Sequence, residues 1–184
     1  MVDLLVHPME GVFVKPLKAH ADSRGTFTEI YRREWGVASE MLQWNLVRSQ
    51  PNVMRGVHLH HTHADYLIVI EGELLLALVD LREDSSTHQQ SLLLPVLADP
   101  AMGVHIPQGV AHGFYFPGNA IYCYAVSDYW SPHDELGCHW NDPGLHLDWP
   151  CVDPILSPRD QTAGSLAAML RQYDLARASE RQAA

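Results

Sequence analysis

Three histidines and one aspartate are spaced as in sites that transfer protons or bind metal ions. His58, His60 and Asp65 follow one another as His-x-His-x4-Asp, and His112 belongs to a second motif further along the chain. Alternate residues of a strand point to the same face, so His58 and His60 are expected to enter one site together while Leu59 faces away. Imidazole and carboxylate groups gathered in this way favour proton transfer or the binding of a divalent metal ion.

The two remaining histidines of this segment are interpreted differently. Strand alternation places His61 and His63 on the opposite face, where no other motif of the sequence gives them a functional partner. We predict that they lie in a surface turn in front of a core strand at residues 66–70, which ends at the turn formed by Glu71 and Gly72. A histidine-rich surface turn is also the alternative interpretation of the whole segment.

The elements that must position these side chains are mostly short strands separated by turn residues. Alternating patterns with many β-branched and aromatic residues predict strands. The predicted strands cover residues 11–16, 26–31, 43–49, 53–59, 66–70, 73–79, 91–96, 102–106, 111–116 and 120–126. Many short strands at this spacing indicate a barrel or a sandwich.

A single helix is predicted near the C-terminal end. Residues 163–178 carry apolar side chains at helical intervals, namely Leu166, Met169, Leu170, Tyr173 and Leu175. We expect this helix to lie on the barrel and to be followed by a frayed tail at residues 180–184.

The composition fits one domain that spans residues 1–184. At 47% apolar residues the chain is long enough for one core and short for two. No apolar run approaches the roughly 20 residues of a membrane span, and the first residues lack the basic start of a signal peptide. Cys123, Cys138 and Cys151 form no metal-binding or redox spacing, as a reducing compartment allows. We therefore expect a cytoplasmic protein without a membrane partner.

The charge distribution argues against nucleic acid and for a small anionic ligand. A formal net charge of −10 opposes binding to a phosphate backbone, which needs a basic surface. Five arginines nevertheless fall in the first third of the chain, where an anionic small molecule would find a local positive site: Arg24, Arg32, Arg33, Arg48 and Arg55. For Arg32 and Arg33, a solvated surface position is the preferred interpretation.

These motifs carry a resemblance at two levels. The paired histidine motifs resemble those of the cupin superfamily, which implies an all-β fold, an antiparallel β-barrel (jelly roll) with a short C-terminal helix. Eight segments in sequence order look like the dTDP-4-dehydrorhamnose 3,5-epimerase family, cupin epimerases of deoxysugar biosynthesis. They are residues 22–29 (DSRGTFTE), 43–45 (QWN), 55–58 (RGVH), 79–82 (VDLR), 106–114 (IPQGVAHGF), 140–143 (WNDP), 148–150 (DWP) and 156–160 (LSPRD).

The resemblance assigns three catalytic roles. In a nucleotide-linked 4-keto-6-deoxysugar the ketone acidifies the hydrogens on C3 and C5, so a base removes one to give an enolate, and a proton returned from the opposite face inverts the centre. His58 matches the base, and Asp160 matches the carboxylate that orients its imidazole. Tyr124 falls at the position of the acid. A tyrosine on a barrel strand also packs in a core, and an aspartate before a helix also serves as an N-cap.

The same resemblance implies binding roles and a partner. Arg24 and Arg55 match residues that grip the diphosphate, with guanidinium geometry suited to phosphate oxygens. Phe27 and Glu29 match the pair that contacts the nucleotide base. Further residues are expected to line the site: Gln43, Asn45, His60, Asp65, His112 and Trp130. In the family the N-terminal segments complete the partner's site, so we expect a homodimer that binds a nucleotide-diphosphate sugar.

Two departures from the family pattern affect the mechanism. Where this chain has His60, the family usually has glutamine. Where this chain has Asp65, the family usually has a lysine, which is thought to help hold the enolate. In the first interpretation a divalent metal ion binds His58, His60, Asp65 and His112 and acts as the electrophile. In the second, which we prefer, no cofactor is used, and Asp65 pairs with His60 or Arg55 beside a metal-free dyad.

Three functions therefore stay open at the level of the sequence. The preferred one is an epimerase acting at C3, or at C3 and C5, of a nucleotide-linked 4-keto-6-deoxysugar. The run from Arg55 to His60 also resembles the sugar-nucleotide 3,4-ketoisomerases, which move a carbonyl rather than invert a centre. The third is a metal-dependent cupin oxidoreductase or a non-catalytic sugar-nucleotide binder. The nucleotide and the sugar are not fixed by these motifs.

Overall fold

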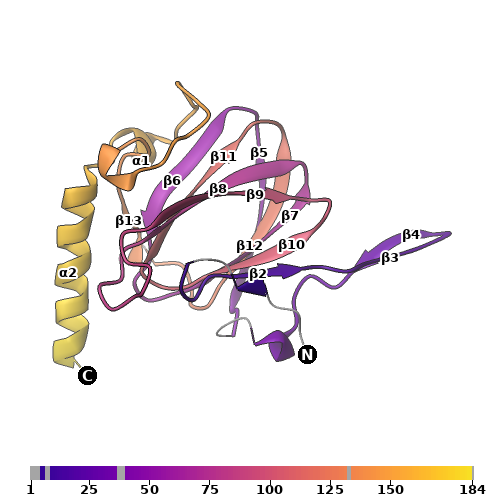
Figure 1. The fold of residues 1–184 in the computed structure, drawn as a ribbon, viewed down its shortest axis with the longest axis horizontal. Coiled ribbons are helices and arrows are strands. Elements are labelled where there is room, and N and C mark those ends of the chain that lie inside the picture. The colour runs from indigo at the N-terminus through magenta and orange to yellow at the C-terminus, as the bar shows by residue number, and fades with distance from the viewer. Residues whose placement is uncertain (1–4, 7–8, 37–39, 132–133, 184) are drawn as a thin grey trace.

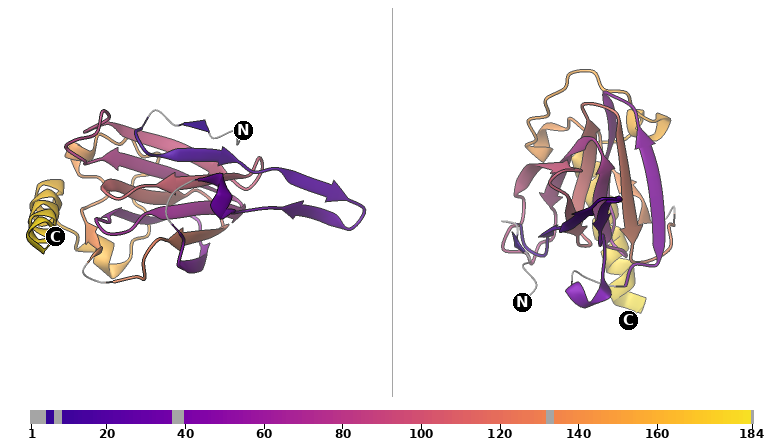
Figure 2. Two further views of the ribbon diagram at one scale, coloured as in Figure 1. Left: turned by 90° about the horizontal axis from the view of Figure 1, so that it is seen from below. Right: turned by 90° about the vertical axis from the view of Figure 1, so that its right-hand side faces the viewer.

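Two antiparallel sheets make up most of the fold. The computed structural model describes residues 5–6, 9–36, 40–131 and 134–183. Seen edge-on, the sheets form two layers (Figure 2). The first sheet has the strand order β1-β2-β10-β7-β12-β5 and the second has β13-β6-β11-β8-β9. This arrangement confirms the predicted all-β jelly roll, in which the described strands form two packed sheets rather than one closed barrel.

The strands are short, as their alternating sequences predict. In the first sheet they are β1 (Leu5–Val6), β2 (Phe13–Pro16), β10 (Met102–Ile106), β7 (Asp65–Glu71), β12 (Ala120–Val126) and β5 (Gln43–Ser49). In the second sheet they are β13 (Leu136–Gly137), β6 (Val53–Leu59), β11 (Val110–Phe116), β8 (Glu73–Asp80) and β9 (Ser91–Leu97). A separate hairpin of β3 (Ala19–Asp22) and β4 (Gly25–Thr28) projects from the body (Figure 1).

The main core lies between the two sheets. Strand β7 shows how the sequence builds it, because both of its faces are apolar. Leu67 and Val69 point into the core shared with the second sheet, while Tyr66 and Ile68 join a smaller cluster on the outer face. Phe116 and Leu76, from β11 and β8, complete the inner layer from the opposite side.

The C-terminal helix packs on the outer face of the second sheet at one end of its strands. Helix α2 (Leu166–Ala183) packs Met169 and Tyr173 against Leu59 and Val79, all of them buried. Leu59 therefore faces away from the inter-sheet space, as predicted. Leu175 is the exception on the predicted apolar stripe, since it is 70% exposed. No helix in the described ranges is both long and apolar enough to span a bilayer.

Most element boundaries agree with the predictions, and the helix differs most. Four strands have the predicted bounds: β5, β6, β10 and β12. The helix starts later than predicted and continues to Ala183, whereas the predicted helix ended at residue 178. Fraying of residues 180–184 stays a prediction, and Ala184 lies outside the described residues. Residues 180–183 (ERQA) all favour helix, which explains the extension. The pattern missed β1, β3, β13 and the short helix α1 (Pro158–Gln161).

A close approach of two strands sets the geometry beside the predicted site. Gly56 on β6 has a φ of +111°, and a Cβ atom there would stand 2.8 Å from the Cα of Gly113 on β11. Only glycine accepts this backbone without strain. The pairing of β6 with β11 shifts register at this point, and His58 lies directly opposite His112. Two of the predicted site residues are thus brought together by the backbone itself.

Candidate active site

A pocket of about 270 Å³ opens between the sheets. Its walls come from β5, β6, β7, β11 and β12 and from the segments around residues 130–135 and 157–160. Nine of the predicted site residues line it: Asn45, Arg55, His58, His60, Asp65, His112, Tyr124, Trp130 and Asp160. Residues from seven segments of the chain therefore meet at one site.

His58 and Asp160 form a hydrogen-bonded dyad in this pocket. His58 Nε2 lies 2.7 Å from Asp160 Oδ1, and the two side chains are 20% and 5% exposed. Ser157 Oγ donates to the other carboxylate oxygen at 2.8 Å. Burial alone would raise the pKa of the Asp160 carboxyl, but the hydrogen bonds from His58 and Ser157 hold this pKa below its usual range. Asp160 therefore stays ionised and orients the imidazole.

The local sequence explains why Asp160 lies at this point. Helix α1 starts with Pro158 and is capped by Ser157, whose Oγ accepts a hydrogen bond from the Asp160 N–H at 3.1 Å. The chain just before the helix is tied to β6, where the Met54 N–H donates to the Ile155 carbonyl at 2.9 Å. The cap of α1 is Ser157, so Asp160 does not act as an N-cap.

Tyr124 lines the same pocket from the opposite sheet. It lies on β12 between Asn45 of β5 and Leu67 of β7, and its ring stacks on that of Tyr122 with centroids 6.1 Å apart. Burial, and then the nearby Asp65 carboxyl, raise the pKa of its phenol. Tyr124 thus keeps its proton at neutral pH.

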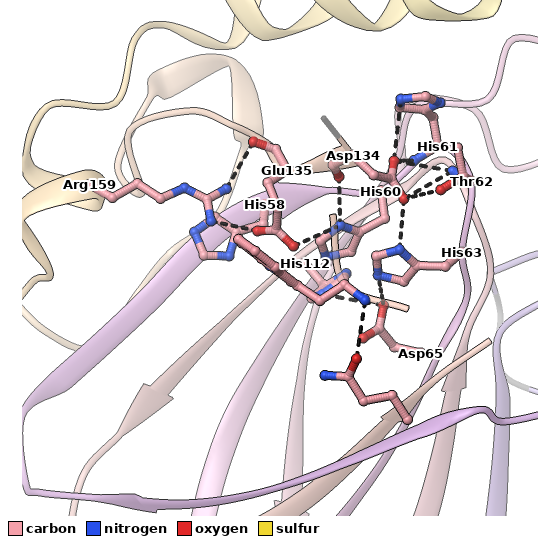
Figure 3. Close-up of polar contacts among 12 residues, drawn as sticks. His58, His60, His61, Thr62, His63, Asp65, His112, Asp134, Glu135 and Arg159 are labelled. Atoms are coloured by element: carbon pink, nitrogen blue, oxygen red, sulfur yellow. Dashed lines mark hydrogen bonds and ion pairs between the residues drawn. The ribbon is translucent and has the colours of Figure 1, made fainter. Parts of the chain in front are cut away.

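A second polar group, which we call the His-Asp cluster, consists of His60, Asp65 and His112. Their exposures are 7%, 6% and 4%, and one donor atom from each lies within 4.8 Å of the others (Figure 3). Burial lowers the pKa of His60 to about 4 and that of His112 well below its usual value. Burial also raises the pKa of Asp65 to about 7. These side chains form one of two groups of described residues with the spacing of metal ligands.

His63 contradicts its predicted surface position. It is 2% exposed and lines the pocket, with Nδ1 2.7 Å from Asp134 Oδ2 and Nε2 3.9 Å from Asp65 Oδ2. His61 is also withdrawn from solvent, with its side chain 11% exposed and its Nε2 3.4 Å from Asp134 Oδ1. The prediction was wrong because Asp134, about 70 residues away in the sequence, binds residues 61–63 and holds this loop in a buried position. It accepts hydrogen bonds from the N–H groups of His61 and Thr62, at 2.6 and 3.2 Å.

The alternation of strand residues could not predict which residues the loop at 61–63 contacts. His63 is turned inward by Asp134, which lay in no motif. Burial opposes a charge on the His63 imidazole, but its hydrogen bond with Asp134 raises its pKa above the usual value. His60, His63 and Asp134 form the second group with metal-ligand spacing.

Glu135 and Arg159 were also missed by the sequence patterns. Both line the pocket, and Arg159 Nη1 lies 2.5 Å from Glu135 Oε2, with a further hydrogen bond from Nη2 to the Glu135 carbonyl at 3.0 Å. Glu135 Oε1 stands 3.6 Å from His60 Nδ1. Arg159 belongs to the segment 156–160, whose resemblance to the family could have pointed to it. Glu135 lies in no sequence motif.

Comparison with known proteins identifies the family of this chain. The sequence profile of the family described as dTDP-4-dehydrorhamnose 3,5-epimerase matches residues 7–168. This chain belongs to that family. A dTDP-4-dehydrorhamnose 3,5-epimerase from Neisseria gonorrhoeae is 35% identical over 157 residues, which cover 80% of this chain but 48% of that protein, so the chain spans about half of this relative.

Two further relatives match over most of their own length. A dTDP-4-dehydrorhamnose 3-epimerase from Streptomyces niveus is 34% identical over 170 residues, 86% of this chain and 81% of that one. The crystal structure of a dTDP-6-deoxy-D-glucose-3,5-epimerase from Legionella pneumophila, in complex with dTDP-4-keto-L-rhamnose, is 30% identical and superposes with a TM-score of 0.83. It covers 91% of this chain and 96% of that one.

Four residues that resemble binding residues of the epimerase family do not line the pocket of their own chain: Arg24, Phe27, Glu29 and Gln43. The first two lie on the projecting hairpin, where Arg24 pairs with Asp22 at 2.7 Å and Phe27 is 65% exposed. Glu29 lies 3.6 Å from Arg32. Gln43 remains close to the rim, since it accepts a hydrogen bond from the Trp130 N–H at 3.2 Å and donates one to Asn45 at 2.9 Å.

The position of Asp65 differs from the pairing with His60 or Arg55 that the metal-free interpretation predicted. Among the described residues, its ion pairs within 4.0 Å are with His63 and His112, at 3.9 and 3.8 Å, rather than with His60 or Arg55. His60 Nδ1 instead lies 2.9 Å from the Asp134 carbonyl oxygen. Arg55 lines the pocket, and its buried Nε has no acceptor among the described residues.

Proposed function

We propose that this chain is an epimerase that acts at C3, or at C3 and C5, of a dTDP-linked 4-keto-6-deoxysugar. One observation carries the proposal: the His58–Asp160 dyad, with its 2.7 Å contact, shares a pocket with Tyr124 on the facing sheet. A base and an acid on opposite walls are what inversion of a carbon centre needs. The activities for which the relatives are named, epimerisation at C3 or at C3 and C5, support the same reaction class.

The chemistry uses each of these residues in turn. The imidazole of His58 removes a proton from the carbon beside the ketone. The C–H electron pair forms a carbon–carbon double bond, and the C=O π pair moves onto the oxygen to give an enolate. The ionised Asp160 stabilises the imidazolium that results. Tyr124 then donates its proton to the other face of the carbon, and exchange with solvent restores both groups. The buried pocket strengthens each of these electrostatic interactions.

The sugar nucleotide is held by residues at the pocket and by a second copy of the chain. The buried Nε of Arg55, which has no acceptor among the described residues, provides a donor for a diphosphate oxygen. Trp130, 57% exposed at the rim, forms a wall beside the sugar. The projecting hairpin, with Arg24 and Phe27, lies outside its own pocket and reaches the pocket of the partner in a homodimer.

The outer face of the first sheet supports this homodimer. Trp44 and Leu46 of β5 are 41% and 58% exposed, and Ile70 of β7 is 49% exposed. Such exposed apolar side chains on one sheet face are typical of an interface, and a second copy covers them by two-fold symmetry. The free thiols of Cys123, Cys138 and Cys151 fit a cytoplasmic protein.

Solvent exchange followed by NMR tests the proposed reaction. The protein is incubated in D2O with a dTDP-linked 4-keto-6-deoxyglucose, and deuterium is expected at C3, or at C3 and C5, of a product with inverted configuration. A product in which the ketone has moved to C3 would instead establish the 3,4-ketoisomerase. Binding of the sugar nucleotide without any deuterium incorporation would reject catalysis.

A further inference from the structure

A second tyrosine lines the pocket beside the proposed acid. Tyr122 and Tyr124 stand two residues apart on β12, so their side chains leave the same face of the strand. Both line the pocket, and their rings lie nearly parallel, with 25° between the planes and centroids 6.1 Å apart. Proton transfer in the proposed function uses the hydroxyl of Tyr124 and leaves that of Tyr122 without a role.

Aromatic neighbours from the facing sheet fix the ring of Tyr122. It stacks on Phe116 with centroids 5.4 Å apart and packs against Phe114 at 5.7 Å. The residue is 2% exposed, so its ring is held on all sides by the protein. The position of its hydroxyl is therefore set before a ligand binds. Such preorganisation makes a hydrogen-bond donor effective where charge develops in a transition state.

The hydroxyl of Tyr122 has no partner among the described residues. Nor is it one of the fully enclosed polar atoms that lack a partner, which are Ser49 Oγ, Arg55 Nε and His105 Nε2. It therefore borders open space, and the open space beside Tyr122 is the pocket. Burial raises the pKa of this phenol above its usual value, so the hydroxyl keeps its proton. The pocket thus contains a fixed, protonated donor whose acceptor must come from a ligand.

Formation of an enolate calls for a donor of this kind. When His58 removes the proton, negative charge collects on the ketone oxygen, which is two bonds away from the carbon that reacts. A partly desolvated pocket must supply a hydrogen-bond donor or a cation for this charge. Among the described lining residues there is no lysine. Arg159 is paired with Glu135, and Arg55 faces the diphosphate in the proposed function.

Asn45 is the other uncharged donor on this wall, but it is held less rigidly. It lies opposite Tyr124 on β5, and its Oδ1 accepts a hydrogen bond from Gln43 at 2.9 Å. Its side chain is half-buried and has no aromatic packing of the kind that surrounds Tyr122. Tyr122 is therefore the better preorganised donor of the two.

We propose that the hydroxyl of Tyr122 donates a hydrogen bond to the ketone oxygen of the sugar and stabilises the enolate formed there. This inference rests on the proposed function and adds a catalytic residue to it. Each phenol reaches about 2.6–3.2 Å to a substrate atom. Rings 6.1 Å apart can thus serve two atoms of one sugar, with Tyr124 at the reacting carbon and Tyr122 at the oxygen. Tyr122 keeps its proton throughout, so no bond to its oxygen forms or breaks.

Tyr122→Phe removes the hydroxyl and keeps the ring with its stacking. Deuterium incorporation and inversion both begin with the enolate, so both should fall together. We expect kcat for each signal to fall about 100-fold, as for the loss of one oxyanion donor, while KM stays close to the native value. Tyr124→Phe should instead lower inversion far more than deuterium incorporation. The ratio of the two signals therefore distinguishes the two hydroxyls.

Tyr115→Phe is the matched control for the loss of a buried phenol. Tyr115 is 9% exposed and lies on β11, outside the pocket lining, where its hydroxyl donates to Asn52 Oδ1 at 3.3 Å. This variant should keep the native kcat for both signals. A loss like that of Tyr122→Phe would mean that any buried tyrosine matters equally, and would remove the special role of Tyr122.

Calorimetric titration with dTDP, which carries no sugar, separates the ketone from the diphosphate as the partner of the hydroxyl. Tyr122→Phe should bind dTDP as the native chain does, which also shows that its pocket is intact. Weaker binding of dTDP would assign the hydroxyl to the diphosphate or to the shape of the pocket and overturn the proposal.

The exchange assay gives the remaining outcomes. Native-like kcat in Tyr122→Phe would reject the role of this residue and leave the epimerase intact. A fall in inversion without an equal fall in deuterium incorporation would make Tyr122 a proton donor and also overturn the proposal. Absence of exchange by the native chain would reject the proposed function, and with it the role of Tyr122.

Discussion

On the side of the pocket formed by β6 and α1, His58 and Asp160 are already paired at 2.7 Å, whereas on the side formed by β7 and β11, Asp65 and His112 stand 3.8 Å apart. Both pairs combine an imidazole with a buried carboxylate. In the first, a hydrogen bond and a capping serine satisfy the carboxylate. In the second, the carboxylate faces a lone pair. The same two residue types thus form a hydrogen-bonded pair on one side of the pocket and stand beyond hydrogen-bond distance on the other.

The largest effect is expected from breaking the paired side. His58→Asn keeps a polar side chain of similar size but removes the base, so deuterium incorporation into the sugar should fall roughly 10²- to 10⁴-fold. The rate is measured by NMR in D2O at constant sugar nucleotide. The exposed His88→Gln serves as the control and should retain the native rate. Exchange by His58→Asn at a native-like rate would remove His58 from its role as base.

The next largest effect is expected for Tyr124→Phe, which distinguishes removal of the proton from its return to the sugar. Tyr124→Phe keeps the ring and its packing on Tyr122 but removes the acid, so inverted product should form about 100-fold more slowly. Deuterium incorporation should fall much less, since His58 still removes and returns a proton on its own face. Tyr129→Phe, at a tyrosine that is 69% exposed, is the matched control. Equal loss of both signals in Tyr124→Phe would contradict its assignment as the acid.

The two sides also differ in how far the sequence predicted them. The paired side followed from the resemblance, because His58 and Asp160 each stand in a segment that matches the family, residues 55–58 and 156–160. The strands were predictable for a similar reason, since alternation in β5 or β12 is a local property. His63, Asp134 and Glu135 were missed because their positions depend on a contact between loops about 70 residues apart. No local period encodes such a contact.

A third prediction tests the loop that supports the unpaired side. Asp134 accepts from the N–H groups of His61 and Thr62 and from His63, besides a short hydrogen bond from the Thr62 hydroxyl. An amide accepts through one oxygen only, so Asp134→Asn should lower the free energy of unfolding by about 2–3 kcal/mol. Urea denaturation measures this difference. Asp128→Asn, at an exposed position in the same segment, should change stability by less than about 0.5 kcal/mol.

The smallest effect, a dependence of stability on pH, belongs to the paired side again. The pKa of Asp160 is held below its usual range, so its stabilising contribution is complete above the ordinary value of about 3.9 and is lost as the pH falls through the lowered value. Asp160→Asn should therefore unfold with about 1 kcal/mol less free energy than the native chain at pH 7. Below about pH 4 the two denaturation curves should approach each other. A difference that stays constant into acid would mean that Asp160 acts in the fold by packing and not by its charge.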